Sequence, residues 1–150
     1  MLFRSWTLDG IDVLHRSPVD IYIDEWVYDL IDVVERTGAT RVLIDSLNDL
    51  RLASPDDTRF QEYIFSLLQR WSRRGVTLQM TYETGSLFGE IGEHTSTISH
   101  LADNVLLLQM VLRKTVERSM VVVKTRASTH EQAPRPFSIS GAGIELEARG

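Results

Sequence analysis

Large apolar side chains between residues 23 and 34 recur at spacings of three and four, the period of one helix face. The residues that follow this spacing are Ile23, Trp26, Val27, Leu30, Ile31 and Val34. The pattern predicts an amphipathic helix. We expect it to end at Gly38, because glycine readily adopts the backbone conformation that closes a helix C-terminus.

A second stretch with the same period follows Pro55 and the acidic pair Asp56–Asp57. Proline favours the first turn of a helix, and carboxylates there interact well with the free N–H groups. The apolar face of this stretch consists of Phe60, Ile64, Leu67, Leu68 and Trp71. We therefore predict a second helix that begins near residue 55 and ends at Gly75.

Shorter apolar runs of strand length lie before, between and after these two helices. They cover residues 10–16, 41–45, 76–82, 105–111 and 120–124, and a closing hairpin is expected from 134–140 and 144–147. Polar turns around residues 113–118 and 141–143 join the later runs, whereas the glycine-containing stretch 83–98 predicts a long loop. This order predicts an α/β fold in which antiparallel strands extend a parallel sheet.

Composition limits the classes of protein to which the chain can belong. Its 150 residues, 43% of them hydrophobic, are typical of a single soluble domain, and no apolar run approaches the roughly 20 residues that cross a membrane. The sequence has no cysteine, which excludes disulfides and thiol chemistry and fits a reducing cytoplasm. Its first residues also lack the layout of a signal peptide, so we expect a cytoplasmic protein without membrane association.

The charge of the chain bears on its partners. The formal net charge is −5, which gives no general attraction for nucleic acid, so a nucleic-acid partner is not expected. Lys114 and Lys124 are the only lysines among 16 basic residues, and the others are arginines. The four histidines show no spacing typical of metal ligands, so a zinc site is not expected either.

Four segments together carry a family resemblance. They are RVLIDSLNDL at 41–50, ISHLADNVLLLQ at 98–109, KTRASTH at 124–130 and RPFSISGAGIELE at 135–147. In this order they resemble the C-terminal part of a KaiC-type ATPase module, in the RecA-like superfamily of P-loop NTPases. The resemblance implies a single domain over residues 1–150 with a partial RecA-like three-layer fold. Its sheet would be mostly parallel and would end in antiparallel strands and a hairpin.

One part of the family pattern does not occur in this sequence. A phosphate-binding P-loop needs the motif G-x-x-x-x-G-K-[S/T], whose glycines let backbone N–H groups approach the phosphates. Lys114 and Lys124 are each followed by threonine, but no glycine stands in the stretch before either of them. The chain therefore resembles a module whose front part is absent, and we do not expect it to hydrolyse ATP alone.

Asp45 ends a buried apolar run, where a carboxylate would face the crevice in which α/β folds bind ligands. By motif alone, a structural strand end is the better interpretation, because many strands end in this way. The resemblance implies instead that Asp45 holds the Mg²⁺ of Mg-ATP through water, with Ser46 beside it, and only when nucleotide is present. Thr81 and Glu83 either face the same crevice or simply end the next strand.

The segment KTRASTH has basic and polar residues at alternate positions. If the chain there is extended, Lys124, Arg126, Ser128 and His130 project to one side and suit a terminal phosphate. The resemblance implies that Lys124 and Arg126 form a finger that acts on the nucleotide of a neighbouring subunit. The alternative is a solvated strand end, and the finger interpretation predicts that both cations are accessible and outside buried ion pairs.

Two functional hypotheses follow from these residues. One is an ATPase module that lacks its P-loop but retains the strand with Asp45 and the finger. The other is a non-enzymatic module for self-assembly or regulation. In either case we expect a homo-oligomer, a dimer or a ring. The resemblance implies that the P-loop strand would lie between strands 76–82 and 105–111, and unpaired strand edges invite pairing with another chain.

Overall fold

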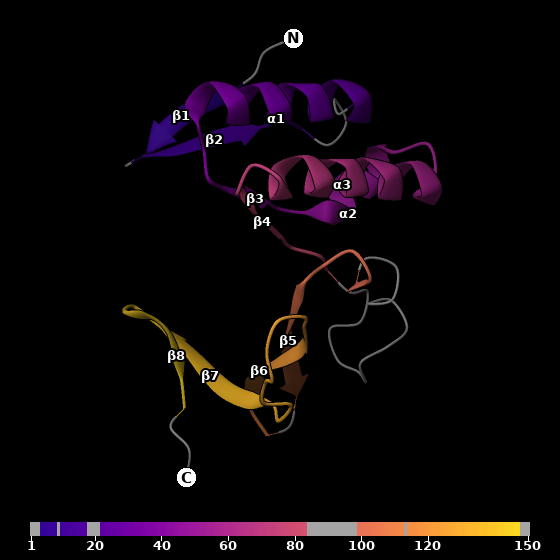
Figure 1. Cartoon of the computed structure of the whole chain (residues 1–150). Helices are drawn as coiled ribbons and strands as arrows, with labels where there is room; N and C mark the ends of the chain where they lie inside the picture. The colour runs from indigo at the N-terminus through magenta and orange to yellow at the C-terminus, as the bar shows by residue number, and fades with distance from the viewer. Residues whose placement is uncertain (1–3, 9, 18–21, 84–98, 113, 148–150) are drawn as a thin grey trace. The chain divides into compact units, whose positions relative to one another are not determined.

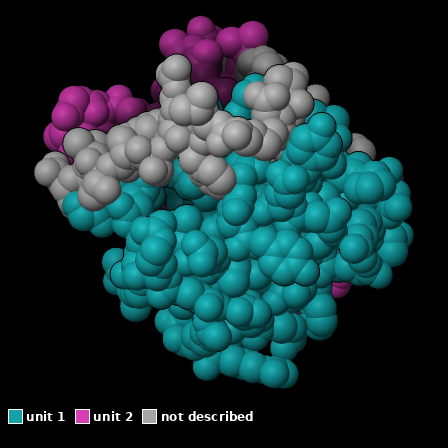
Figure 2. Space-filling model, turned by 90° about the horizontal axis from the view of Figure 1, so that it is seen from above, with its two compact units in different colours: residues 1–83 teal, residues 84–150 magenta. Residues whose placement is uncertain are grey.

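The computed structural model describes residues 4–8, 10–17, 22–83, 99–112 and 114–147. Most of the loop expected at 83–98 lies outside these residues. Contacts between residues divide the chain into two compact units, residues 1–83 and residues 84–150 (Figure 2). Each unit is described by itself.

The first unit combines three helices with two small sheets (Figure 1). Its elements are β1 (Arg4–Leu8), β2 (Ile11–His15), α1 (Ile23–Thr37), β3 (Arg41–Ile44), α2 (Leu47–Ala53), α3 (Asp57–Ser72) and β4 (Thr77–Met80). Strands β1 and β2 form an antiparallel pair, whereas β3 and β4 are parallel. The sequence pattern predicted neither β1 nor α2.

Helix α1 ends at the glycine that the sequence suggested, and helix α3 begins at the acidic pair Asp56–Asp57. Gly38 follows α1 with a φ of 67°, in the left-handed region that favours glycine, and its N–H donates to the Val34 carbonyl at 3.0 Å. The Asp56 side chain caps α3 by accepting a hydrogen bond from the Arg59 N–H at 2.8 Å. Both predicted helices are confirmed.

Ion pairs at both ends show that α1 and α3 lie side by side and run in the same direction (Figure 1). Near their first turns, Arg59 lies 3.7 Å from Asp24. Near their last turns, Glu35 accepts hydrogen bonds from both Arg70 and Arg74. The Arg70 hydrogen bond, supported by Arg74, outweighs desolvation and lowers the pKa of Glu35 below its usual value.

The core of the first unit is built around the apolar face of α3. The largest fully buried side chains are Trp71, Phe60, Leu47, Ile64 and Leu67. The buried face of α1 adds five more residues, Ile23, Trp26, Val27, Leu30 and Val34. Leu47 and Leu50 of α2 are also buried.

The parallel pair of β3 and β4 has one covered and one open face. Val42 pairs with Leu78 and Ile44 with Met80, and these four side chains are buried or half-buried on the same face. Leu43 projects to the other face and is 62% exposed. The apolar run at 42–44 therefore belongs to a strand that is covered on one side within its unit.

The second unit contains a four-stranded antiparallel sheet in the order β5-β6-β7-β8. Its strands are β5 (Asn104–Leu112), β6 (Val116–Thr125), β7 (Arg135–Ser140) and β8 (Gly143–Leu146). The closing hairpin is confirmed. The turn expected at 113–118 is shorter than predicted, because polar residues 117–119 belong to β6 and pair with β5.

The α/β class and the combination of a parallel with an antiparallel sheet are confirmed, with the parallel part formed by β3 and β4. In the described parts of the chain, no helix has both the length and the apolar character needed to cross a membrane.

We expect Leu67→Ala to lower the free energy of unfolding by about 2–5 kcal/mol, because it leaves a cavity in the core. Leu67 is 0% exposed, whereas Leu52 in α2 is 83% exposed and provides a matched control. Leu52→Ala should change the free energy of unfolding by less than about 0.5 kcal/mol. Urea denaturation measures both variants, and equal losses would contradict this description of the core.

Candidate functional site

The carboxyl ends of β3 and β4 meet at one edge of their sheet because the two strands are parallel. Asp45 and Ser46 follow β3, and Thr81 follows β4. The Thr81 hydroxyl donates to Asp45 Oδ1 at 2.5 Å, and the Thr81 N–H donates to the Ile44 carbonyl at 3.0 Å. Asp45 is exposed, and the Asp45–Ser46 peptide bond is cis. The edge therefore presents an accessible carboxylate with one oxygen held by a hydroxyl.

Helix α2 binds the chain that leaves β4. The Asn48 amide donates from Nδ2 to the Glu83 carbonyl at 3.0 Å, and its Oδ1 accepts from the Glu83 N–H at 2.8 Å. Ser46 Oγ lies 3.5 Å from Asp49 Oδ2. These contacts hold the segment after β4 next to the start of α2.

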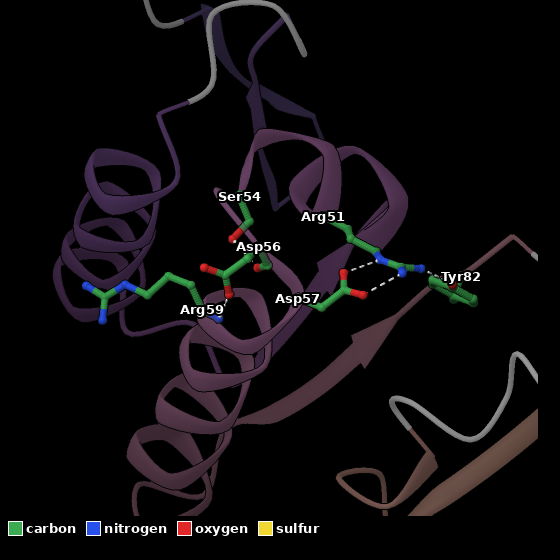
Figure 3. Close-up of polar contacts among 6 residues, drawn as sticks. All are labelled: Arg51, Ser54, Asp56, Asp57, Arg59 and Tyr82. Atoms are coloured by element: carbon green, nitrogen blue, oxygen red, sulfur yellow. Dashed lines mark hydrogen bonds and ion pairs between the residues drawn. The ribbon is translucent and has the colours of Figure 1, made fainter.

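Arg51 makes a second connection at the same edge (Figure 3). Its guanidinium donates from Nε and Nη2 to the two carboxylate oxygens of Asp57, at 2.7 and 2.8 Å. Nη1 donates to the Tyr82 hydroxyl at 3.1 Å. The Arg51 hydrogen bonds, together with its charge, outweigh desolvation and lower the pKa of Asp57 below its usual value.

The structure brings Asp45, Ser46 and Thr81 together at this edge. The Glu83 side chain is exposed, while its backbone binds Asn48. Sequence reasoning missed Asn48 and Arg51 because it did not predict α2, and it gave Tyr82 no role beyond ending the strand expected at 76–82. Only Leu47 and Leu50 of α2 are buried, and two residues are too few to define a helical period.

In the second unit, Lys124 and Arg126 both contact the segment of residues 99–103. Lys124 Nζ donates to the carbonyls of Ser99 and Ala102, at 2.6 and 2.8 Å. Arg126 Nη2 donates to the His100 carbonyl at 2.8 Å, and Nη1 lies 3.4 Å from Asp103 Oδ1. The Arg126 side chain is 55% exposed, whereas Lys124 is half-buried.

The extended geometry that we expected for the whole KTRASTH segment ends at Thr125, the last residue of β6. Residues 126–128 bend, so the alternation that would align Lys124 with Ser128 and His130 does not continue. Ser128 is exposed, and His130 is half-buried. Within the described residues, His130 Nε2 is buried without a hydrogen-bond partner.

Comparison with known proteins identifies relatives of the chain. The model of the KaiC ATPase family matches residues 14–150. A circadian clock oscillator protein KaiC of Prochlorococcus marinus is 31% identical over 152 residues, covering 95% of this chain and 28% of the relative. The circadian clock protein KaiC3 of a Synechocystis species is 26% identical over 146 residues, covering 96% of this chain and 29% of the relative. The chain thus spans less than a third of the length of these curated relatives.

A solved structure has the same fold. The crystal structure of a KaiC-like protein from the hyperthermophilic archaeon Pyrococcus horikoshii superposes with a TM-score of 0.70 at 23% identity. The match covers 84% of this chain and 54% of that one. This likeness extends the α/β assignment to a RecA-like fold.

The Arg51–Asp57 pair predicts a pH-dependent contribution to stability. The pKa of Asp57 is held below its ordinary value in the folded chain, so the unfolded chain binds the proton more readily. The contribution of the pair to the free energy of unfolding is therefore complete above the ordinary pKa of an aspartate. It is lost as the pH falls through the lower pKa that Asp57 has in the folded chain. We expect Asp57→Asn to be less stable than the unsubstituted chain at neutral pH, with the difference shrinking in acid.

Chemical denaturation across a pH series measures this difference. Arg51→Gln should remove the same pH-dependent part of the free energy of unfolding. The double variant, which carries both Arg51→Gln and Asp57→Asn, should lose no more of this part than either single variant. An Asp57→Asn variant that keeps the original pH profile of stability would contradict the assignment.

Proposed function

The chain belongs to the KaiC ATPase family, and from this premise we propose that it forms part of an ATP site shared between subunits. In this proposal Asp45 and Ser46 serve the Mg²⁺ of Mg-ATP. The KTRASTH segment supplies Lys124 and Arg126 as a finger to the nucleotide of a neighbouring subunit, with Ser128 and His130 nearby. The observation that carries the proposal is the accessible Asp45 carboxylate, held by Thr81 at the carboxyl edge of parallel strands.

The residues at this edge fit a magnesium ion that arrives with nucleotide. Mg²⁺ prefers oxygen ligands, retains several waters and usually binds one or two carboxylates together with substrate phosphates. Asp45 is an exposed carboxylate, and Ser46 follows it directly in the sequence. Among the described residues no group of three or more acidic or histidine side chains could hold a metal. These features support a magnesium ion that binds mainly through the phosphates of the nucleotide. When bound, the ion would polarise these phosphates.

The finger would act on phosphates that another part of the assembly holds. No G-x-x-x-x-G-K-[S/T] motif occurs in the 150 residues, so we propose that this chain alone does not hydrolyse ATP. Arg126 is exposed, and its guanidinium has the fork geometry that suits a phosphate. These observations support action in trans.

We also propose that the chain works as a homo-oligomer, dimer or ring, in the cytoplasm. One face of β5 supports self-association, because four of its alternate side chains are apolar and exposed: Leu106, Leu108, Met110 and Leu112. A contiguous apolar patch of this kind is typical of an interaction surface. We further propose that the two units act together as one domain.

The same exposed face favours the alternative function, a non-enzymatic module for self-assembly or regulation. Such a module would keep the apolar face of β5 but would have no use for the Asp45 carboxylate. The two functions therefore differ in whether Asp45 affects nucleotide binding or turnover in the assembled protein.

We expect the chain alone to bind Mg-ATP negligibly and to show no ATPase activity, because no P-loop motif is present to hold the phosphates. Isothermal titration calorimetry measures the binding, with Asp45→Asn as the comparison variant. Micromolar affinity that disappears in Asp45→Asn would mean that the chain has a phosphate site of its own, and the proposal would then be wrong.

We expect the chain to form at least a dimer at micromolar concentration, because apolar strand faces and open strand edges favour pairing with another copy. Multi-angle light scattering gives the mass, and Leu108→Lys on the exposed face of β5 should shift it toward the monomer. Gln69→Lys, on the exposed side of α3, serves as a control for added charge. A stable monomer whose unfolding does not depend on concentration would refute the prediction.

A further inference from the structure

The chain that leaves β4 is bound by the start of α2 as if β3 continued beside it. The Thr81 N–H donates to the Ile44 carbonyl at 3.0 Å, and the Thr81 carbonyl accepts from the Leu47 N–H at 3.0 Å. Leu47 is the first residue of α2, so the chain has left the sheet at this point. The Asn48 side chain provides the next pair of hydrogen bonds, to the Glu83 carbonyl at 3.0 Å and from the Glu83 N–H at 2.8 Å. Its carboxamide therefore takes the place of a peptide group.

The chemistry of this contact requires a carboxamide. Asparagine carries a carbonyl acceptor and an NH₂ donor side by side, as a peptide group does. An ionised aspartate has the same size but only acceptors, so at position 48 it would bind the Glu83 N–H and repel the Glu83 carbonyl. The Asn48 side chain is half-buried, which limits the competition of water for these two bonds.

The two bonds of Asn48 lie beyond the end of β4, which is Met80. The residue between Thr81 and Glu83 is held as well, because the Tyr82 hydroxyl accepts from Arg51 at 3.1 Å (Figure 3). The ends of a hydrogen-bonded segment open more easily than its interior. Because Asn48 binds Glu83, Thr81 lies inside the bonded segment and not at its end.

The position of Thr81 bears directly on Asp45. The Thr81 hydroxyl donates to Asp45 Oδ1, so one oxygen of this exposed carboxylate has a fixed partner. Without that partner, an exposed side chain can occupy several rotamers. The orientation of the Asp45 carboxylate therefore depends on Thr81, and the place of Thr81 depends on the bonds that hold residues 81–83 to α2.

We propose that Asn48 is a positioning residue of the candidate site. By holding Glu83 it keeps Thr81 on Asp45, and it thereby keeps the carboxylate oriented for the Mg²⁺ of Mg-ATP. Asn48 itself contacts neither the ion nor the nucleotide. The relay from Asn48 through Thr81 to Asp45 does not depend on the proposed function, whereas its consequence for Mg²⁺ rests on that function.

Hydrogen exchange of the Thr81 and Glu83 amides in the full 150-residue chain tests the relay. We expect Asn48→Ala to speed the exchange of both amides about tenfold, the factor for one lost hydrogen bond of about 1.4 kcal/mol. Asn48→Asp keeps the acceptor for the Glu83 N–H and should affect the Glu83 amide less. Gln69→Ala removes a carboxamide from the exposed side of α3 and should leave both amides unchanged. Unchanged exchange of the Thr81 amide in Asn48→Ala would overturn the relay.

The Mg²⁺ concentration that gives half-maximal ATP turnover by the assembled protein tests the action through Thr81. Asn48→Ala and Thr81→Val should each raise this concentration about tenfold, a typical effect of losing a residue that orients a metal ligand. A purely structural loss would reduce the amount of folded protein without changing this concentration. The double variant should raise it no further than Thr81→Val alone. If the two shifts multiply in the double variant, Asn48 acts by another route and the proposal is wrong.

Failure of the proposed function can be distinguished from failure of the positioning role. If no assembly that contains the chain turns over ATP, the proposed function fails, and the role of Asn48 toward Mg²⁺ fails with it. If turnover requires Mg²⁺ but Asn48→Ala leaves the half-maximal concentration unchanged, the proposed function stands and the positioning role fails. The exchange measurement decides in either case whether Asn48 holds Thr81.

Discussion

Parallel pairing of β3 with β4 is the constraint from which the candidate site in the first unit arises. Parallel strands cannot be joined by a tight turn, so the chain crosses over through α2 and α3 before it returns as β4. The crossover packs its apolar face on the sheet and leaves both carboxyl ends at one edge. Asp45 and Thr81 come from different strands and meet there because the register aligns Ile44 with Met80.

The elements that the sequence could predict are those whose signals are local. Helices α1 and α3 each have a long apolar face, and Gly38 and Asp56 mark their ends by backbone conformation and capping. Helix α2 has seven residues and only two buried side chains, which is too short for its period to be recognised. The start of β6 was missed for a different reason, because residues 117–119 are polar yet pair with β5. Polar side chains on a strand whose surroundings are open resemble a turn in the sequence.

The candidate site was predictable only in part for the same physical reason. Asp45 could be identified because it ends an apolar run, and Thr81 because it ends the next strand along the chain. Asn48 binds the backbone of Glu83 from 35 residues away, and Arg51 contacts Tyr82 from 31 residues away. Such contacts depend on where the chain lies after it has crossed from β3 to β4. A local sequence pattern does not predict this position.

Both units use polar side chains to hold backbone near residues that could bind ligands. Asn48 pairs with the backbone of Glu83, next to the edge that carries Asp45, and Lys124 donates to the turn that Arg126 also contacts. A sequence motif records residue types and spacing, so Lys124 and Arg126 looked equivalent in it. Their environments differ because β6 ends between them, at Thr125, and the chain then bends. Lys124, which is part of the strand, is half-buried in its own unit, whereas Arg126, which lies beyond the strand, is exposed. The end of a strand can therefore give two cations of one motif different surroundings, half-buried at Lys124 and exposed at Arg126.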